Sequence, residues 1–241
     1  MRDLKAYWDA WPHATAEEAK AEEIVRTCAR EEGDREIPIP VPIERWMEGP
    51  LHLNFEVRDL SELQEGLNGP EVIGIASCSD PPSIVVSKEI EYQDGRFRFT
   101  CAHELGHIVL HRDVAVRFEE DDRTMHQLDR GLEAKANRFA SRFLMPWQAL
   151  QSELLRILHD CEVDQQAYVE ILLSTNEKSV WLWKHRVLPR ITQRFGVSLS
   201  AAIYRFNSIR LPGRRRFLSK DIVQDLLSSE MSIGRSLRRI V

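Results

Sequence analysis

The sequence contains no long apolar run, and this absence limits the class of protein. No stretch approaches the roughly 20 apolar residues that a membrane-spanning helix needs. The opening residues, MRDLKAYWDAWPHA, lack the uninterrupted apolar segment of a secretory signal peptide. The sequence therefore predicts a soluble, cytoplasmic protein without a membrane partner.

Cysteine is also scarce, and its spacing argues against structural cross-links. The four cysteines are far apart and include no C-x-x-C pair, which favours reduced, buried thiols over a disulfide framework or a structural zinc knuckle. They are Cys28, Cys78, Cys101 and Cys161. The apolar content, 43% of 241 residues, is enough to bury a full core.

The most informative stretch is residues 100–112, TCAHELGHIVLHR. It contains the H-E-x-x-H pattern of zinc peptidases, formed by His103, Glu104 and His107, among apolar or small residues that suit a buried helix. Four residues of α-helix advance about 6 Å and return to nearly the same direction, so both imidazoles can bind one ion. Glu104 then lies beside the metal and not on it. Taken alone, the motif is also compatible with an amphipathic helix that happens to contain two histidines.

A catalytic zinc ion takes three protein ligands and leaves one position for water, so a third ligand is expected on another element. Residues 131–146, GLEAKANRFASRFLMP, have apolar residues at helical spacing and place Glu133 on the exposed first turn. Asn137 follows four residues later on the same face. There its side-chain oxygen can accept the spare N–H of a ligating histidine and so hold the ring in place behind the metal.

Two blocks of the sequence resemble the ImmA/IrrE metallopeptidases, a bacterial gluzincin-like family. They are F-T-x-A-H-E-L-G-H-x-x-L-H at 99–111 and E-x-x-A-N-x-F-A-x-x-x-L-M-P at 133–146. The resemblance is weaker in the preceding strands and in the later helix-turn-helix-like stretch. It implies one zinc ion, with manganese as the alternative metal, and it implies Glu104 as the general base. The implied metal ligands are His103, His107 and Glu133.

Two departures from known patterns bear on this ligand set. Many members of the family have an acidic residue where this chain has Lys135, so no rival carboxylate lies beside Glu133. The other zinc-peptidase pattern, H-E-x-x-H-x-x-G-x-x-H, fails because Leu110 and Asp113 stand at its glycine and its last histidine.

The resemblance implies a zinc-dependent endopeptidase that cleaves a helix-turn-helix transcriptional repressor and so derepresses stress-response or mobile-element genes. The alternative is a non-hydrolytic, metal-binding regulator that binds a repressor or DNA through a basic C-terminal region. From residue 184 onward there are 13 basic and three acidic residues, a net charge of +10, whereas the whole chain carries −5. Such a split indicates an anionic partner or two domains that attract each other.

We expect an α+β fold with a zincin-like core, made of a small twisted sheet, the active-site helix and the third-ligand helix. A surface helix is expected at 16–32, and strands at 51–57, 72–76 and 83–87. The metal helix should begin near residue 96. We predict a metallopeptidase domain at 1–146 and a helical region at 147–241.

Within the helical region, helices are expected at 147–161, 164–173 and 180–194, the last interrupted by Pro189. Residues 191–211 have helix-turn-helix proportions, with Gly196 in the turn. Arg205, Arg210 and the cluster 214–216 then become candidates for phosphate contact, which leaves DNA binding open. Trp181 and Trp183 are interpreted as core or interdomain packing.

Three further residues are candidates for the site. His111 lies one turn beyond His107, and since about 12 Å of helix separates it from His103, we assign it a second-shell or packing role. His126 and Tyr92 are candidates for stabilising the oxyanion. His126 falls in 113–129, which is interpreted as an acidic connection that is either a substrate-contacting loop or a solvated excursion.

Overall fold

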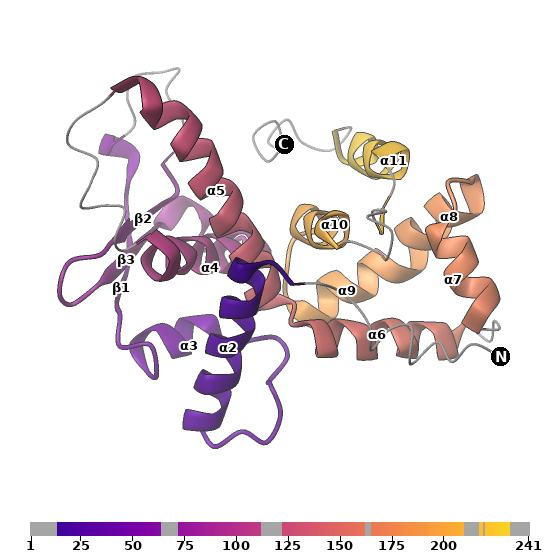
Figure 1. Ribbon diagram of the computed structural model, residues 1–241, viewed down its shortest axis with the longest axis horizontal. Coiled ribbons are helices and arrows are strands. Elements are labelled where there is room, and N and C mark those ends of the chain that lie inside the picture. Colours follow the sequence, from indigo (N-terminus) through magenta and orange to yellow (C-terminus); the bar gives the residue numbers. More distant parts are fainter. Residues whose placement is uncertain are drawn as a thin grey trace. The chain divides into compact units, whose positions relative to one another are not determined.

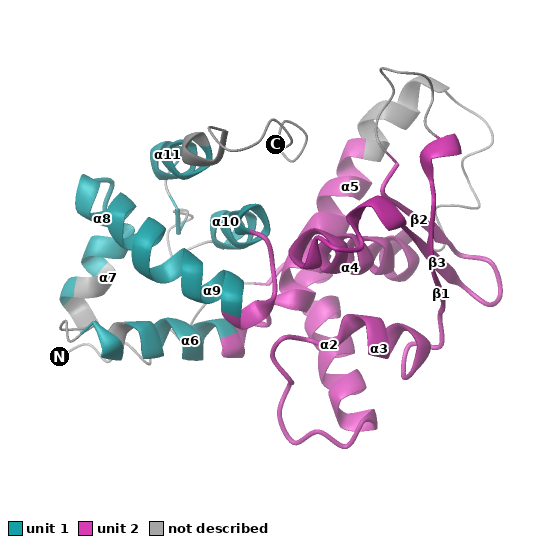
Figure 2. Ribbon diagram, turned by 180° about the vertical axis from the view of Figure 1, so that it is seen from behind, with its two compact units in different colours: residues 1–13, 150–193, 199–241 teal, residues 14–149, 194–198 magenta. Residues whose placement is uncertain are grey.

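The computed structural model describes residues 14–63, 72–111, 122–161, 165–209, 217–218 and 220–231 (Figure 1). They form a mixed α+β fold that is mainly helical and has one small sheet, as predicted. Two compact units are distinguished (Figure 2). The mixed unit consists of residues 14–149 and 194–198, and the helical unit takes its described residues from 150–193 and 199–231. The predicted domain boundary at residue 146 stays a prediction.

The sheet of the mixed unit has three strands in the order β1-β3-β2. The strands are β1 (Asn54–Arg58), β2 (Gly74–Ser77) and β3 (Ser83–Ser87), close to the predicted positions. β1 runs parallel to β3, with Phe55 opposite Ile84, and β2 runs antiparallel, with Gly74 opposite Val86. Ile84 and Val86 alternate with less buried neighbours and are fully buried. One face of the central strand therefore belongs to the core.

Two long helices carry the candidate metal residues. α4 (Asp94–His111) begins two residues before the expected position, and α5 (Asp122–Leu144) packs closely against it. Gly106 makes this approach possible: a Cβ atom there would lie 3.2 Å from the Ala136 Cα and from the Phe139 ring. At that point the two helices meet almost backbone to backbone.

The acidic connection predicted at 113–129 is wrong from residue 122 onward, because α5 begins at Asp122. No proline or glycine interrupts residues 122–130, so the helix can extend through this polar stretch. Residues 113–121, and the side chains of 122–129 with His126 among them, lie outside the described part of the chain.

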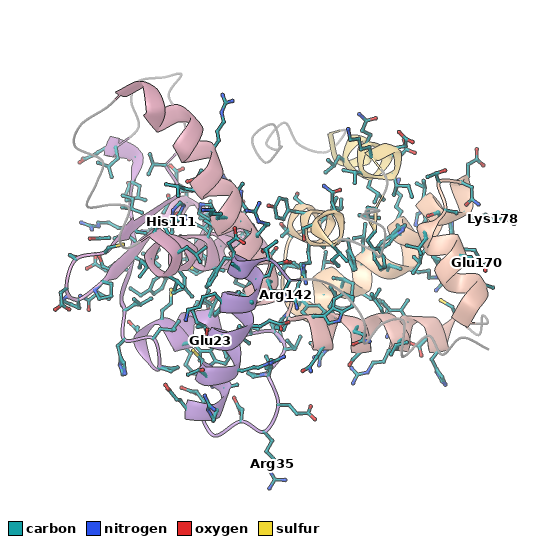
Figure 3. All side chains as sticks on the ribbon, viewed as in Figure 1. Glu23, Arg35, His111, Arg142, Glu170 and Lys178 are labelled. Carbon is teal, nitrogen blue, oxygen red and sulfur yellow. The ribbon has the colours of Figure 1, made fainter. Side chains whose placement is uncertain are left out.

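α2 (Ala16–Glu31) contacts α5 through two ion pairs, one partly and one largely buried. It begins with a capping box formed by Thr15 and Glu18, and Gly33 follows its end with a φ of +81°. Glu17 contacts Arg138 at 2.9 Å, and Glu22 contacts Arg142 at 2.6 Å. Figure 3 labels Arg142 where these helices meet. The short helix α3 (Ile43–Glu48) adds Trp46, which meets Phe143 edge to face.

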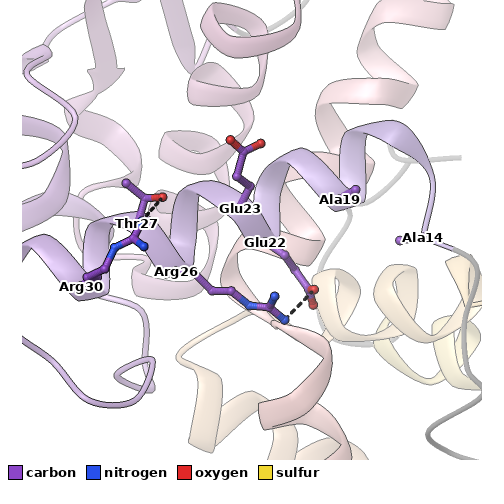
Figure 4. A pocket seen from close by; sticks show the side chains of 7 residues that line it. All are labelled: Ala14, Ala19, Glu22, Glu23, Arg26, Thr27 and Arg30. Atoms are coloured by element: carbon purple, nitrogen blue, oxygen red, sulfur yellow. Dashed lines mark hydrogen bonds and ion pairs between the residues drawn. The ribbon is translucent and has the colours of Figure 1, made fainter.

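The outer face of α2 carries a shallow pocket (Figure 4). An ion pair between Glu22 and Arg26, at 3.5 Å, and a hydrogen bond from Arg30 to Thr27 cross it. None of the candidate metal residues lines this pocket. Its lining is Ala14, Ala19, Glu22, Glu23, Arg26, Thr27 and Arg30.

The helical unit is built around an aromatic cluster. Trp183 is fully buried and contacts Phe206 and Phe217, with ring centroids 4.8 and 5.7 Å apart. Trp181, by contrast, is 52% exposed. The sequence predicts that both tryptophans pack in the core or between domains, and among the described residues only Trp183 is buried in this way. The helices are α6 (Trp147–Asp160, whose first turn belongs to the mixed unit), α7 (Gln165–Leu173), α8 (Glu177–Leu182), α9 (Leu188–Phe195), α10 (Leu199–Ser208) and α11 (Lys220–Met231).

The interruption expected at Pro189 takes the form of a π-helical turn, Trp183–Val187, between α8 and α9. The Leu188 N–H bonds to the Trp183 carbonyl five residues back, and the chain stays helical through the proline. α9 ends at Phe195, Gly196 has a φ of +60°, and α10 begins at Leu199, which is the predicted helix-turn-helix succession. Within the described residues, no helix combines the length and apolar character needed to cross a bilayer.

Candidate metal centre

His103 and His107 project from the same face of α4 because they lie one helical turn apart. Their Nε2 atoms are 3.0 Å apart, and their ring centroids are separated by 4.7 Å. Helical spacing alone therefore aims two nitrogen lone pairs at one point.

Glu133 of α5 completes the group. Its carboxylate oxygens lie 3.1 Å from the Nε2 of His103 and 3.1 Å from the Nε2 of His107. The three side chains can each offer one ligand atom such that all lie within 4.8 Å of one another. Glu133 is the most exposed member, with 48% of its side chain accessible against 15% for His103 and 22% for His107. The group therefore opens to solvent on the Glu133 side.

The second nitrogen of each imidazole is held by a neighbour. The Nδ1 of His103 lies 3.0 Å from the Oδ1 of Asn137, and because an amide oxygen only accepts, the proton belongs on Nδ1 and the Nε2 lone pair is free for a metal. The Nδ1 of His107 lies 3.1 Å from the Nδ1 of His111. Figure 3 labels His111 on α4. Both predicted second-shell residues thus contact the histidine nitrogens that face away from the group.

These donors fit a divalent cation such as zinc. Two atoms that are each about 2.1 Å from one tetrahedral ion lie roughly 3.4 Å apart, close to the separations of the group. Two imidazole nitrogens and one carboxylate form the three-ligand set that leaves a fourth position open in catalytic zinc sites.

Residues 76–207 match the Peptidase M78 family model, described as the IrrE N-terminal-like domain. This match covers more than half of the chain. The chain belongs to the IrrE-like peptidase family. The family is one of metallopeptidases, which implies a divalent metal, and the His-His-Glu group supplies the place for it.

Comparison with individual proteins adds little to this assignment. No curated protein matches the sequence. Among solved structures, the IrrE-like chain is similar to a Mycobacterium tuberculosis transcriptional regulator, with a TM-score of 0.46 and 17% sequence identity over 88% of this chain and 52% of that one. The chain thus spans about half the length of that protein.

In the IrrE-like site, the pKa values of the two glutamates, Glu104 and Glu133, are shifted in opposite directions. In the metal-free protein, where a proton on Nε2 takes the place of a metal, hydrogen bonds from His103 and then His107 hold the pKa of Glu133 well below its usual range, against the opposing effect of burial. Glu104 is only 8% exposed, and burial raises the pKa of its carboxyl although the charges of His103 and His107 pull the other way. One carboxylate is thus stabilised as an anion for binding, while the other is tuned towards holding a proton.

The histidines also differ in their surroundings. Burial lowers the pKa of His103, but the hydrogen bond with Glu133 and the charges of Glu104 and Glu133 outweigh it, and the net shift is upward. Burial, reinforced by the charge of His107, lowers the pKa of His111 to about 4. His111 is therefore neutral at physiological pH and can accept the proton on the Nδ1 of His107.

Several sequence candidates lie elsewhere. Tyr92 is 88% exposed, on the turn before α4, and no described contact of the metal group involves it. Arg205 was a candidate for phosphate contact, and this is wrong: its side chain is fully buried, because its position on α10 faces the core of the helical unit. Arg210 and residues 214–216 lie outside the described residues.

Gly74, the first residue of β2, lies directly against Glu104, a position that the sequence does not predict. No motif includes it. The signal that points to it is a general one, that a glycine within a strand often marks a close approach of backbone to another group.

Proposed function

We propose that this protein is a zinc-dependent endopeptidase. The observation that supports it best is the convergence of His103, His107 and Glu133 within 4.8 Å, with the buried carboxyl of Glu104 on the same helix. We assign the first three residues to metal binding and Glu104 to proton transfer. When bound, a zinc ion supplies a Lewis acid that activates water and polarises the scissile carbonyl.

The side chains around this ion would have separate roles in the proposed reaction. Glu104 accepts a proton from the attacking water and returns it to the leaving amine, a task suited to a carboxyl whose pKa burial has raised. Asn137 and His111 hold His103 and His107 in the tautomer that presents Nε2. Of the two oxyanion candidates, we keep His126, because Tyr92 has no described contact with the metal group.

The sheet offers a way to bind an extended peptide. β2 pairs with β3 on one side, and among the described strands nothing pairs with its other side. Gly74 of this edge strand lies against Glu104, the residue to which we assign proton transfer. A substrate backbone that adds to β2 as a further strand would therefore run past Glu104.

The substrate we propose is a helix-turn-helix transcriptional repressor, whose cleavage derepresses stress-response or mobile-element genes in the cytoplasm. This proposal rests on the resemblance to the IrrE-like family. The test is to incubate the purified protein, with and without zinc, with the repressor encoded beside it, and to map the products by mass spectrometry. Cleavage that a chelator abolishes and zinc restores is the expected result.

The alternative is a metal-binding regulator that does not hydrolyse its partner, and the net charge of +10 from residue 184 onward favours it. Salt-sensitive DNA binding by the zinc-loaded protein, without cleavage of the neighbouring repressor, would support this alternative over the peptidase.

A further inference from the structure

Gly74 opens the strand that lies over the metal helix. It pairs with Val86 of β3, and the adjacent Ile73 carbonyl accepts a hydrogen bond of 2.9 Å from the Ser87 N–H. This pairing is made by backbone atoms of both strands, so β3 fixes how far the backbone of Gly74 lies from α4.

The space beside Gly74 is filled by two side chains of α4. A Cβ atom at this position would lie 2.6 Å from the Oε1 of Glu104, 2.9 Å from its Cγ, and 2.7 Å from the Cγ2 of Thr100. All three distances are below those that real Cβ atoms show. The φ angle of Gly74 is not in the positive region, so an alanine fits the backbone and only the space forbids it.

Neither neighbour can move away freely. Thr100 is 4% exposed, and its branched Cβ restricts its rotamer within the helix. Glu104 is 8% exposed and lies between α4 and the strand. A methyl group at position 74 must therefore displace the strand, Thr100 or the Glu104 carboxyl, and the Oε1 of Glu104 is the atom that it meets most closely.

We propose that Gly74 is a positioning residue for Glu104. Its missing side chain lets the backbone of β2 cover the Glu104 carboxyl and hold it in one place beside the metal group. This inference rests on the proposed function for its catalytic part, since Glu104 is the proton carrier there. The steric part states that position 74 needs a glycine because of the Glu104 side chain. It does not depend on the proposed function or on the substrate.

The steric part is tested by a double-mutant cycle on thermal stability, which needs no substrate. Gly74→Ala, Glu104→Ala and the double variant are compared with the parent by Tm in the metal-free protein. If the methyl group meets the Glu104 carboxyl, the Tm loss caused by Gly74→Ala falls by at least about half when Glu104 is already alanine. Equal losses in both backgrounds would overturn the proposal. If Gly74→Ala does not fold, recovery of folded protein in the double variant supports it, and failure of both variants overturns it.

The catalytic part is tested with the zinc-loaded protein on whichever repressor the parent cleaves. Gly74→Ala should lower kcat by about 10- to 100-fold, as expected for a misplaced catalytic group, while KM and zinc affinity change less than about threefold. Gly131→Ala is the matched control: it adds the same methyl group two residues from Glu133, with nothing within 4 Å, and should leave kcat unchanged. A Gly74→Ala variant with parental kcat would refute the role. A parent that cleaves nothing would refute the proposed function and leave the stability cycle as the test of Gly74.

Discussion

Asn137 offers the sharpest test of how this site holds its metal. Asn137→Ala removes the acceptor that lies 3.0 Å from the Nδ1 of His103, and with it the contact that fixes the tautomer and orientation of the ring. Loss of such an outer contact typically weakens metal binding 10- to 100-fold, or about 1.4–2.7 kcal/mol. We expect the zinc Kd to rise by that factor.

The same substitution should scarcely change the stability of the metal-free protein. The lost hydrogen bond costs about 0.5–1.5 kcal/mol, and alanine regains about 0.6 kcal/mol of helix propensity in α5. The free energy of unfolding should therefore change by less than about 1 kcal/mol, which separates a metal effect from a folding effect.

The assay is competition for zinc with a chromophoric chelator, alongside chemical denaturation of the metal-free protein. Arg130→Ala, an exposed change on the same helix, is the control and should keep the parental Kd. If Asn137→Ala bound zinc within threefold of the parent, or if Arg130→Ala weakened binding equally, the tautomer argument for His103 would be wrong.

Three further predictions follow from the same geometry. Glu104→Gln should keep zinc affinity but lower kcat by about 10²–10⁴, since it removes the proton carrier and no ligand; cleavage at the parental rate would exclude the shuttle. In the native protein, iodoacetamide should spare the buried thiols, because burial raises the pKa of Cys28 to about 11 and raises that of Cys101 further, whereas peptide mapping should find label on the partly exposed Cys78 and Cys161; label on all four before denaturation would contradict the core packing. In the metal-free protein, the pKa of Glu133 lies below its ordinary value of 4.5, so its contribution to the free energy of unfolding is complete above pH 4.5 and is lost in acid. The pKa of His103 lies above its ordinary value of 6.5, so its contribution is complete below pH 6.5 and is lost as the pH rises. The excess stability of the parent over Glu133→Gln should thus peak between those values in denaturation curves, and parallel pH profiles would show that the ion pair does not form.

The local features of the site could be predicted from the sequence because residues four apart in an α-helix lie on the same face. The spacing of His103 and His107, and that of Glu133 and Asn137, sets which side chains share a face before any tertiary contact forms. The family blocks then indicated which two helices meet. The family match confirms the family, and the mixed fold confirms the fold class. The roles of the individual site residues stay predictions.

Features that depend on contacts between distant segments could not be predicted. The close approach of Gly74 to Glu104 depends on the register between β2 and β3 and on the distance between the sheet and α4. Neither can be read from the residues next to Gly74 or Glu104 in the sequence. The burial of Arg205 likewise depends on which face of α10 packs inward. The early start of α5 is not predicted, because a run of charged residues is typical of a connection, although nothing in residues 122–130 breaks a helix.

The three candidate metal ligands differ in their exposure, and this difference bears on exchange of an ion with the medium. Glu133 stands at the mouth of the group with about half of its side chain accessible, while the two imidazoles lie deeper. If these three side chains hold a metal ion, the carboxylate would be the ligand most open to competition from a chelator in the medium. Occupancy of the site, and the stability that it adds, would then depend on the free concentration of the ion.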